Sequence, residues 1–484
     1  MIQASAAQHG MWVAASGAAS TAYHMPLVVT FAHDPDVGLL TKSCAAVVER
    51  HALLSSAIVD RDGVAYLARA SGAAGLRVAG PGESVEEELT RPFDLAEGPL
   101  IRFVLFGRTL VATAHHLIFD GYSKEVLLRD LAAFYAGEIP VPLPRTAADE
   151  LAADAARLAG DRAAAAEFWS GRWAEPLPVV VGDHVLTGRD HGAGQVHAFE
   201  PPVPDLPGLT RFETLLAAIH ATLGGHGNPR VTTGVDLSTR APGPVGTVGS
   251  FATELPVDSQ PDPDASFAEF AAELRAALRA MYPHRSVPLA RAVRRLRPHA
   301  AVAPVSVSYR RVGAAPRFDG AAADVDWLAF AGSVRGDLQL QAVDDGTTVT
   351  ARLRYSAAAA PVAARFAEDL CEVLTRVAAA PATRVRDLAG SGASAPAVMP
   401  EAPASAPAPA PGGALVEPVL AIWRDVFGNQ SIGPDDDLFD LGGDSLTATQ
   451  IIARMRKTLG LDVDIDTFFD YPTVNGVVHA AGAR

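Results

Sequence analysis

The chain has 484 residues, nearly half of them apolar, and a formal net charge of −15. This length predicts two or three globular domains, and the acidic balance argues against a nucleic-acid partner, which selects basic surfaces. Two cysteines are too few for a disulfide framework or a thiolate metal site, and with neither a secretory signal nor an apolar run of about 18 residues we expect no membrane contact, a cytoplasmic location and a monomer.

Two apolar runs near residue 100 predict a buried β-hairpin. Residues 100–106 read LIRFVLF and residues 110–114 read LVATA, both of strand length. The second run leads directly into HHLIFDG at 115–121, and the apolar residues that follow recur at helical spacing. The sequence therefore places a histidine pair at the end of a core strand, just before a helix.

The histidine pair His115–His116 has several chemical interpretations. A neutral imidazole near pH 7 can accept a proton or hold a nucleophile in place, and general base catalysis contributes about 10²–10⁴-fold. Two loop histidines with satisfied hydrogen bonds are the structural alternative. A metal site would need a third or fourth ligand at suitable spacing, and none stands out, so we expect no metal.

A low-complexity segment divides the chain at residues 389–413. Of its 25 residues, 22 are Ala, Pro, Gly or Ser. Such a composition predicts a flexible, semi-extended linker, which at about 3.1 Å per residue reaches up to roughly 75 Å. An inert spacer is the alternative, but a linker of this reach would let the small C-terminal part approach different faces of the large N-terminal part.

Residues 414–484 predict a small helical bundle. Apolar residues at helical spacing cover 415–427 and stop at Gly428, and a second helical pattern begins at Leu446. The run 468–474 is expected to open a last short helix. About 70 residues is near the lower limit for an independent core.

Ser445 is the most informative residue of this bundle. It stands behind a Gly-Gly turn and an aspartate, in the run LGGDSL at 441–446. The serine is either a nucleophile, an attachment point or a helix N-cap. GDSL also names an esterase family, but too few residues follow it here for a sheet, and Thr447 breaks the G-x-S-x-G nucleophile pattern. Attachment is the favoured interpretation.

The C-terminal segment resembles a peptidyl carrier domain of nonribosomal peptide synthetases along its full length. The resemblance rests on LGGDSL at 441–446 and on the aromatic run at 468–474. It implies a four-helix all-α carrier over residues 414–484. It also implies that a phosphopantetheinyl transferase attaches 4′-phosphopantetheine to Ser445, whose arm then holds acyl groups as thioesters.

The N-terminal part resembles the condensation domains of the same synthetases, within the chloramphenicol-acetyltransferase-like group. HHLIFDG matches their HHxxxDG motif, and further matching elements lie at 5–12, 50–54, 168–169, 234–240, 248–251 and 284–289. The resemblance implies an α/β condensation domain over residues 1–388. Its two αβα lobes, about 1–175 and about 176–388, would form a V with a tunnel between them.

The resemblance also assigns roles to the motif residues His115, His116, Asp120 and Gly121. His116 would lie in the middle of the tunnel and either deprotonate the acceptor amine or orient it. Asp120 would be structural, paired with an arginine such as Arg240, and Gly121 would let the turn close. The sequence departs from the family at Ser55, at Thr253 and at 285–286, which leaves the substrate class open.

The expected function is amide-bond condensation between a donor acyl or peptidyl thioester and an acceptor amine held on the chain's own carrier. No adenylation signature or P-loop is found, so we expect a stand-alone adenylating enzyme to load the carrier in trans. The other expected partners are an upstream donor carrier protein and a downstream synthetase or release enzyme. An ester-forming or free-amine-using condensation, or a catalytically silent platform that recruits partners, are the alternatives.

Overall fold

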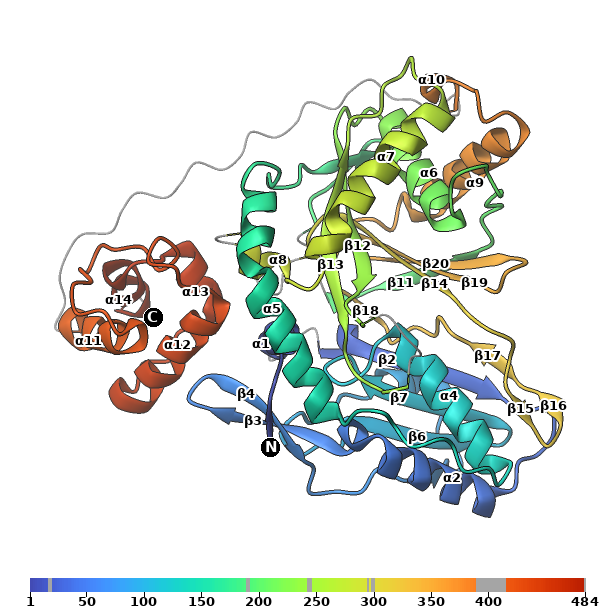
Figure 1. Ribbon diagram of the computed structural model, residues 1–484, viewed down its shortest axis with the longest axis horizontal. Coiled ribbons are helices and arrows are strands. Elements are labelled where there is room, and N and C mark those ends of the chain that lie inside the picture. Colours follow the sequence, from blue (N-terminus) through green and yellow to red (C-terminus); the bar gives the residue numbers. More distant parts are fainter. Residues whose placement is uncertain are drawn as a thin grey trace.

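The computed structural model describes residues 1–15, 20–188, 192–241, 246–293, 296, 301–388 and 415–482. The expected linker at 389–413 lies outside the described residues. Residues 1–388 form a large unit of two lobes that open as a V, and residues 415–482 form a C-terminal bundle beside it (Figure 1). The predicted class, an α/β two-lobed fold followed by an all-α bundle, is confirmed.

The first lobe is built on a five-stranded sheet that contains the predicted hairpin. In spatial order its strands are β17 (Asp324–Asp326), β2 (His24–Thr30), β7 (Thr109–His115), β6 (Ile101–Phe106) and β5 (Leu76–Val78). β6 and β7 pair antiparallel, as expected. Leu110 and Val111 point to opposite faces of β7 and are both fully buried, so packing on both faces fixes the register that ends at His115.

Helices α2 (Val37–Arg50) and α4 (Gly121–Tyr135) share one hydrophobic core with this sheet. The apolar spacing after residue 121 correctly predicted α4. The remaining elements of the first half are β1 (Ile2–Gln3), α1 (Ala6–Ala15), β3 (Ser56–Arg61), β4 (Val64–Arg69), α3 (Val85–Thr90) and α5 (Ala147–Ser170), with short 3-10 turns at Ser20–Tyr23 and Ala52–Ser55.

The second lobe has a six-stranded mixed sheet with helices over one face (Figure 1). In spatial order its strands are β11 (Gln195–Phe199), β20 (Val349–Tyr355), β19 (Leu338–Asp344), β14 (Val305–Arg311), β12 (Val231–Ser238) and β13 (Ala252–Ser259). The covering helices are α6 (Arg211–Gly225), α7 (Phe267–Met281), α9 (Ala363–Ala379) and α10 (Val385–Leu388). Short elements complete it: β8 (Val179–Val181), β9 (His184–Leu186), β10 (Gly192–Ala193), a 3-10 turn (Tyr282–His284), α8 (Leu289–Ala292) and β18 (Ser333–Val334). The short pair β15 (Arg317–Phe318) and β16 (Ala321–Ala322) lies instead beside α4 of the first lobe (Figure 1).

A segment of the chain crosses from the second lobe to the first. After β14 the chain leaves the second lobe, and Phe318 and Ala323 enter the hydrophobic core of the first. β17 then pairs antiparallel with β2 as the edge strand of the first sheet. The walls between the lobes are therefore built from both halves of the sequence.

The C-terminal bundle has four helices around Trp423, which is fully buried. They are α11 (Val416–Phe427), α12 (Ser445–Leu459), α13 (Ile465–Asp470) and α14 (Val474–Gly482). Gly428 ends α11 in the left-handed region, as its sequence predicts. The expectation that 468–474 opens a single helix is wrong, because Pro472 lacks an N–H and disfavours helical backbone at Tyr471, so this run joins α13 to α14.

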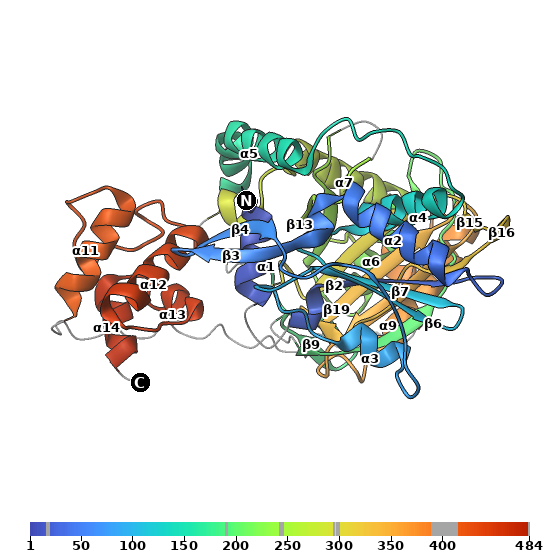
Figure 2. The same ribbon diagram turned by 90° about the horizontal axis from the view of Figure 1, so that it is seen from below.

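The bundle packs on the large unit through α12, which lies against α1 and the β3–β4 hairpin (Figures 1 and 2). Thr449 Oγ1 lies 3.0 Å from His9 Nε2 and 3.1 Å from the carbonyl oxygen of Gly63 at the hairpin tip. Lys457 Nζ donates to Asp62 at 2.8 Å. The contacts are few and mostly polar, which is typical of a docked partner rather than of a shared core. Every helix in the described part of the chain is too short or too polar to cross a membrane.

Gly63 offers a test of this docking. A Cβ at Gly63 would lie 2.3 Å from the Thr449 carbonyl oxygen, whereas a Cβ at Gly107, in the β6–β7 turn, would meet nothing within 4 Å. Both glycines have positive φ, so Gly63→Ala and Gly107→Ala carry a similar backbone cost of about 1–2 kcal/mol. We expect only Gly63→Ala to release the bundle and increase the radius of gyration in small-angle X-ray scattering. Identical scattering of the two variants would contradict this docking.

Candidate functional site

A cavity of about 300 Å³ lies between the lobes. The first lobe contributes His116, Asp120 and the start of α4, and the second contributes Asp236 and strands β14, β19 and β20. The predicted motif therefore opens into an inter-lobe cavity.

The structure separates the two histidines of the motif. His115, the last residue of β7, is 1% exposed; its Nδ1 accepts the Leu117 N–H at 3.2 Å, and its ring packs edge-on against Phe93. The backbone N–H of His116 donates to the Tyr23 carbonyl at 2.8 Å, and the His116 side chain lines the cavity. Of the pair, His116 is thus the residue placed to touch a substrate.

The surroundings of His116 favour its neutral form. Burial lowers the pKa of His116 below 6.5, the positive charge of Arg335 lowers it further, and Asp236 and Asp120 oppose this with smaller effects. A neutral imidazole at pH 7 has a free lone pair, so the His116 ring can accept a proton from a bound amine.

Asp120 gathers hydrogen-bond donors from both lobes. Its carboxylate accepts from the N–H and hydroxyl of Ser123, both at 2.8 Å, and thereby caps α4. The Arg240 guanidinium donates to both carboxylate oxygens at 2.9 and 3.1 Å, and the Phe251 N–H donates at 3.1 Å. The expected Asp120–Arg240 pair is present, and it holds the turn after His116 against the second lobe.

Gly121 is the first residue of α4, and its missing side chain leaves room for an arginine. A Cβ at Gly121 would lie 3.2 Å from Arg310 Nη1, which donates to the Gly121 carbonyl. The sequence predicted a glycine that closes a turn, and the structure adds that it also admits the Arg310 side chain into the cavity wall.

Sequence reasoning missed a second charged group in the cavity. Arg335 lies 3.8 Å from Glu254, and its guanidinium is 5.5 Å from the centroid of the Tyr23 ring. Burial raises the pKa of Glu254 to about 7, against the opposing effect of Arg335, and Asp236 directly across the β12–β13 ladder raises it too. Asp236 lies in the quoted run 234–240, but no motif marks Arg335 or Glu254.

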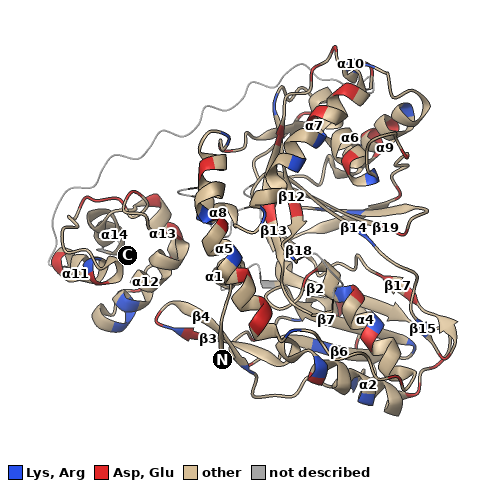
Figure 3. Ribbon diagram, viewed as in Figure 1, with Lys and Arg blue, Asp and Glu red and all other residues tan. Residues whose placement is uncertain are grey.

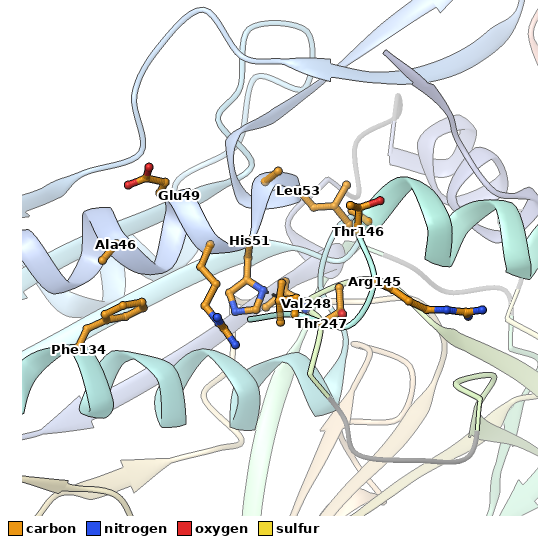
Figure 4. Close-up of a pocket in the computed structure, with 13 residues that line it drawn as sticks. Ala46, Glu49, His51, Leu53, Phe134, Arg145, Thr146, Thr247 and Val248 are labelled. Carbon is orange, nitrogen blue, oxygen red and sulfur yellow. Dashed lines mark hydrogen bonds between the residues drawn. The ribbon is translucent and has the colours of Figure 1, made fainter. Parts of the chain in front are cut away.

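A second hollow, of about 490 Å³, lies outside the first cavity, between α2, α4 and the start of α5 (Figure 4). Its core is the Arg50–His51 element. His51 Nε2 and Arg50 Nε both lie 2.8 Å from Asp130 of α4, and His51 Nδ1 faces the Val248 N–H at 3.5 Å. These contacts tie α2 and α4 to the same second-lobe segment that binds Asp120.

Ser445 is the first residue of α12, on the side of the bundle that faces the large unit. Asp444 caps the helix by accepting the N–H groups of Leu446 and Thr447 at 3.0 and 3.1 Å. Arg291 of α8 forms an ion pair with Asp444, and basic residues of α5 and α8 lie on the facing surface (Figure 3). Ser445 is 8% exposed in this position.

Helix α1 connects the Ser445 region with the histidine motif. Gln8 Nε2 donates to the Leu117 carbonyl at 2.7 Å, within the motif itself, while the adjacent His9 contacts Thr449 of α12. One helix of the first lobe thus touches both predicted functional elements.

Two family models match the chain. One, described as a condensation domain, matches residues 1–181, and one, described as a phosphopantetheine attachment site, matches residues 417–481. Surfactin synthase subunit 2 of Bacillus subtilis (strain 168) is 25% identical over 309 residues, which cover 58% of this chain and 8% of that protein. The probable non-canonical nonribosomal peptide synthetase CymA of Salinispora arenicola (strain CNS-205) is 49% identical over 57 residues, or 12% of this chain and 1% of that protein. The matched part of the chain spans less than a tenth of the length of these relatives.

Solved condensation domains share the fold of the large unit. The first condensation domain of the calcium-dependent antibiotic synthetase, with a substrate analogue, gives a TM-score of 0.67 at 19% identity and covers 80% of this chain and 98% of that one. The starter condensation domain of rhizomide synthetase, with C8-CoA, gives 0.68 at 17% identity and covers 80% and 96%. The expected chloramphenicol-acetyltransferase-like fold is confirmed.

The residues around Ser445 fit a phosphopantetheine group, and the matched attachment site means that the C-terminal bundle carries one covalently. Within the described residues the Ser445 hydroxyl has no hydrogen-bond partner. Arg291 and Arg162 place positive charge beside Asp444, the residue before Ser445, which favours an anion such as the phosphodiester of the arm. A Cβ at Gly443 would lie 2.7 Å from the Leu438 carbonyl oxygen, so the turn before Ser445 requires a glycine.

Breaking the Asp120–Arg240 pair should destabilise the large unit. Both side chains are nearly buried, 3% and 11% exposed, and removing one partner of a buried pair costs about 3–5 kcal/mol. We expect Arg240→Met to lower the urea midpoint of the large unit accordingly. Arg386→Met, which removes a solvent-exposed pair with Asp264, should leave it nearly unchanged. Equal midpoints for the two variants would show that the pair does not hold the lobes.

The pKa of the His116 imidazole should depend on Arg335. The Arg335 charge disfavours the imidazolium, so Arg335→Met should raise the pKa of His116, and the ring would then protonate at a higher pH as the solution is acidified. Titration of histidine-labelled protein by NMR, with His116→Gln to assign the signal, measures this. The exposed Arg172→Met serves as the control, and an unchanged or lower pKa in Arg335→Met would contradict the assigned cause.

Proposed function

Because the chain joins a condensation domain to a phosphopantetheine carrier domain of the nonribosomal peptide synthetase type, we propose that it forms an amide bond between a donor acyl thioester and an acceptor amine. The observation that carries this proposal is His116, which faces the inter-lobe cavity in an environment that favours neutral imidazole. His115, Asp120 and Gly121 support it: they hold the strand end, the turn and the cavity wall around that ring.

The reaction needs one proton acceptor and one positioned nucleophile. The amine nitrogen attacks the thioester carbonyl carbon, the C–N bond forms, and the C–S bond breaks as the sulfur leaves as a thiolate. His116 accepts the proton that the amine nitrogen loses, or holds the amine by a hydrogen bond while the departing sulfur receives the proton. Either role uses the neutral ring, and general base help of this kind contributes about 10²–10⁴-fold.

We assign Ser445 as the attachment site and the C-terminal bundle as the holder of the acceptor. When bound there, phosphopantetheine supplies a thiol that carries the acceptor as a thioester. The contact of α12 with α1 supports the acceptor role, because α1 also contacts the Leu117 carbonyl beside His116. A phosphopantetheinyl transferase would install the arm, a separate adenylating enzyme would load it in trans, an upstream carrier would bring the donor, and a downstream synthetase or release enzyme would take the product.

Intact-protein mass spectrometry tests this assignment. With a phosphopantetheinyl transferase, an aminoacyl load and an acyl donor carrier, the parent chain should gain the mass of the arm and then of the condensed product. Ser445→Ala should gain neither mass. His116→Ala should load normally but form product about 10²-fold more slowly or worse, whereas the exposed His33→Ala should match the parent. Product formation by His116→Ala at the parent rate would reject the catalytic proposal.

A further inference from the structure

Three basic side chains of the inter-lobe cavity meet at the segment 327–329. Lys124 Nζ donates to the first carbonyl of this segment at 2.6 Å, and Arg354 Nη2 donates to the second and third at 3.3 and 3.0 Å. The Arg310 guanidinium lies over the indole of the same segment, 5.1 Å from the ring centroid. We call Lys124, Arg310 and Arg354 the cation cluster; all three line the cavity that contains His116.

The cation cluster is buried, and two of its three members have no carboxylate partner among the residues that the structure describes. Lys124 is 4% exposed and Arg354 is 8% exposed. In the described part of the chain no carboxylate lies within 4 Å of either one, and Arg310 has only Glu125, at 3.9 Å. The Nε atoms of Arg310 and Arg354 are buried with no hydrogen-bond partner among the described residues. Three basic side chains, two of them with an unused Nε donor, therefore line one cavity.

Neighbouring acids offset the charge of Arg310, on which Glu125 and Asp120 act, more than that of Lys124. Asp326, whose charge acts on Lys124, pairs with Arg352 at 2.8 Å. Burial lowers the pKa of Lys124 well below 10.5; Arg310, Arg354 and Arg352 lower it further, and Asp326 opposes them. Burial also lowers the pKa of Arg354 to about 10.

Burying a cation without a partner is unfavourable, so the two unpaired members of the cluster, Lys124 and Arg354, indicate a binding role rather than a stabilising one. Arginine presents two parallel N–H donors that match the two oxygens of a carboxylate, and lysine adds a compact charge. A planar anion such as a carboxylate would therefore fit the donors of the cation cluster.

We propose that the cation cluster binds a carboxylate of the substrate, so that this chain condenses a component that carries an acid group. The proposal rests on the proposed function, because it names the substrate class of the same cavity. Three sources share this chemistry: the side chain of a carrier-bound acceptor, the α-carboxylate of a free amino acid that acts as acceptor, and the distal carboxylate of a dicarboxylic acyl donor.

Matched acid and amide substrates test the proposal. One arm compares glutamyl with glutaminyl loads on Ser445, a second compares free alanine with alaninamide, and a third compares a glutaryl donor with its neutral monoamide. We expect the acid to be favoured by about tenfold or more in one arm, since hydrogen bonds between charged groups are the strong ones. That arm identifies the source of the carboxylate. Equal rates for acid and amide in all three arms would overturn the proposal.

Variants connect the preference to the cluster. Lys124→Met and Arg354→Met keep an unbranched apolar stem but remove the charge, and each should bring the acid-to-amide ratio close to one. Arg311→Met removes the neighbouring cation of β14, whose side chain is 76% exposed, and should leave the ratio as in the parent chain. A ratio that changes equally in all three variants would show that overall charge, not the cluster, determines the preference.

Calorimetry provides a measurement that needs no turnover. The probes are pantetheine derivatives in which a stable amide replaces the thioester, one ending in glutarate and one in its neutral monoamide, titrated into the full chain. The glutarate probe should bind about tenfold tighter or more. Lys124→Met should remove this difference between the two probes.

The two experiments separate the two proposals. Tighter binding of the acid probe without product from any substrate would reject the condensation and keep the anion site. Product from neutral and acidic substrates alike, with equal binding of the two probes, would reject the anion site and keep the condensation.

Discussion

The Asp120 carboxylate is the constraint on which the inter-lobe cavity depends. It accepts hydrogen bonds from the Ser123 and Arg240 side chains and from two backbone N–H groups, one in each lobe. A buried carboxylate with this many partners has one position of low energy. The same group starts α4, the helix that carries Lys124, and holds the turn after His116 against the second lobe, so the lobes and the His116 ring are positioned by one side chain.

The cavity around Asp120 contains two regions of different charge. His116 stays neutral because burial and the positive charge of Arg335 both disfavour the imidazolium and lower its pKa. Arg335 in turn is held by Glu254 and Tyr23, within reach of Asp236. The cation cluster lies at the segment 327–329, which leads from β17 of the first sheet back toward the second lobe. The charge of Arg335 at one end of the cavity is therefore paired, whereas Lys124 and Arg354 at the other end have no carboxylate partner among the described residues.

Features coded locally were predictable from the sequence. The β6–β7 hairpin, α4 after the histidine motif and the end of α11 at Gly428 follow from apolar period and glycine position. The pair of Asp120 with Arg240 followed from resemblance, not from spacing. The break at Pro472 was equally predictable, because proline disfavours helical backbone at the residue before it, and the expectation of one helix there neglects this. Ser445 as the attachment residue and the two-lobe boundaries remain predictions.

Features made by distant segments were not predictable. β17 joins the first sheet after some 200 residues of other structure, because its edge position is decided by tertiary packing. Arg335 and Arg354 lie in runs without any motif. Only the folded cavity reveals that Arg335 lies over the Tyr23 ring and that Arg354 donates to carbonyls of the segment 327–329. The contact of Thr449 with the β3–β4 hairpin likewise depends on two surfaces that no local pattern describes.

The low exposure of Ser445 limits the access of other proteins to its hydroxyl while the bundle is docked. With α12 against α1, the serine is 8% exposed and Asp444 is held by Arg291. Under the proposed function, an enzyme that modifies Ser445 would compete with the large unit for this surface, because both cannot occupy it together. Modification and condensation would then use different positions of the bundle. The strength of the few polar contacts between α12 and the large unit, not a chemical barrier, determines how often the bundle occupies each position.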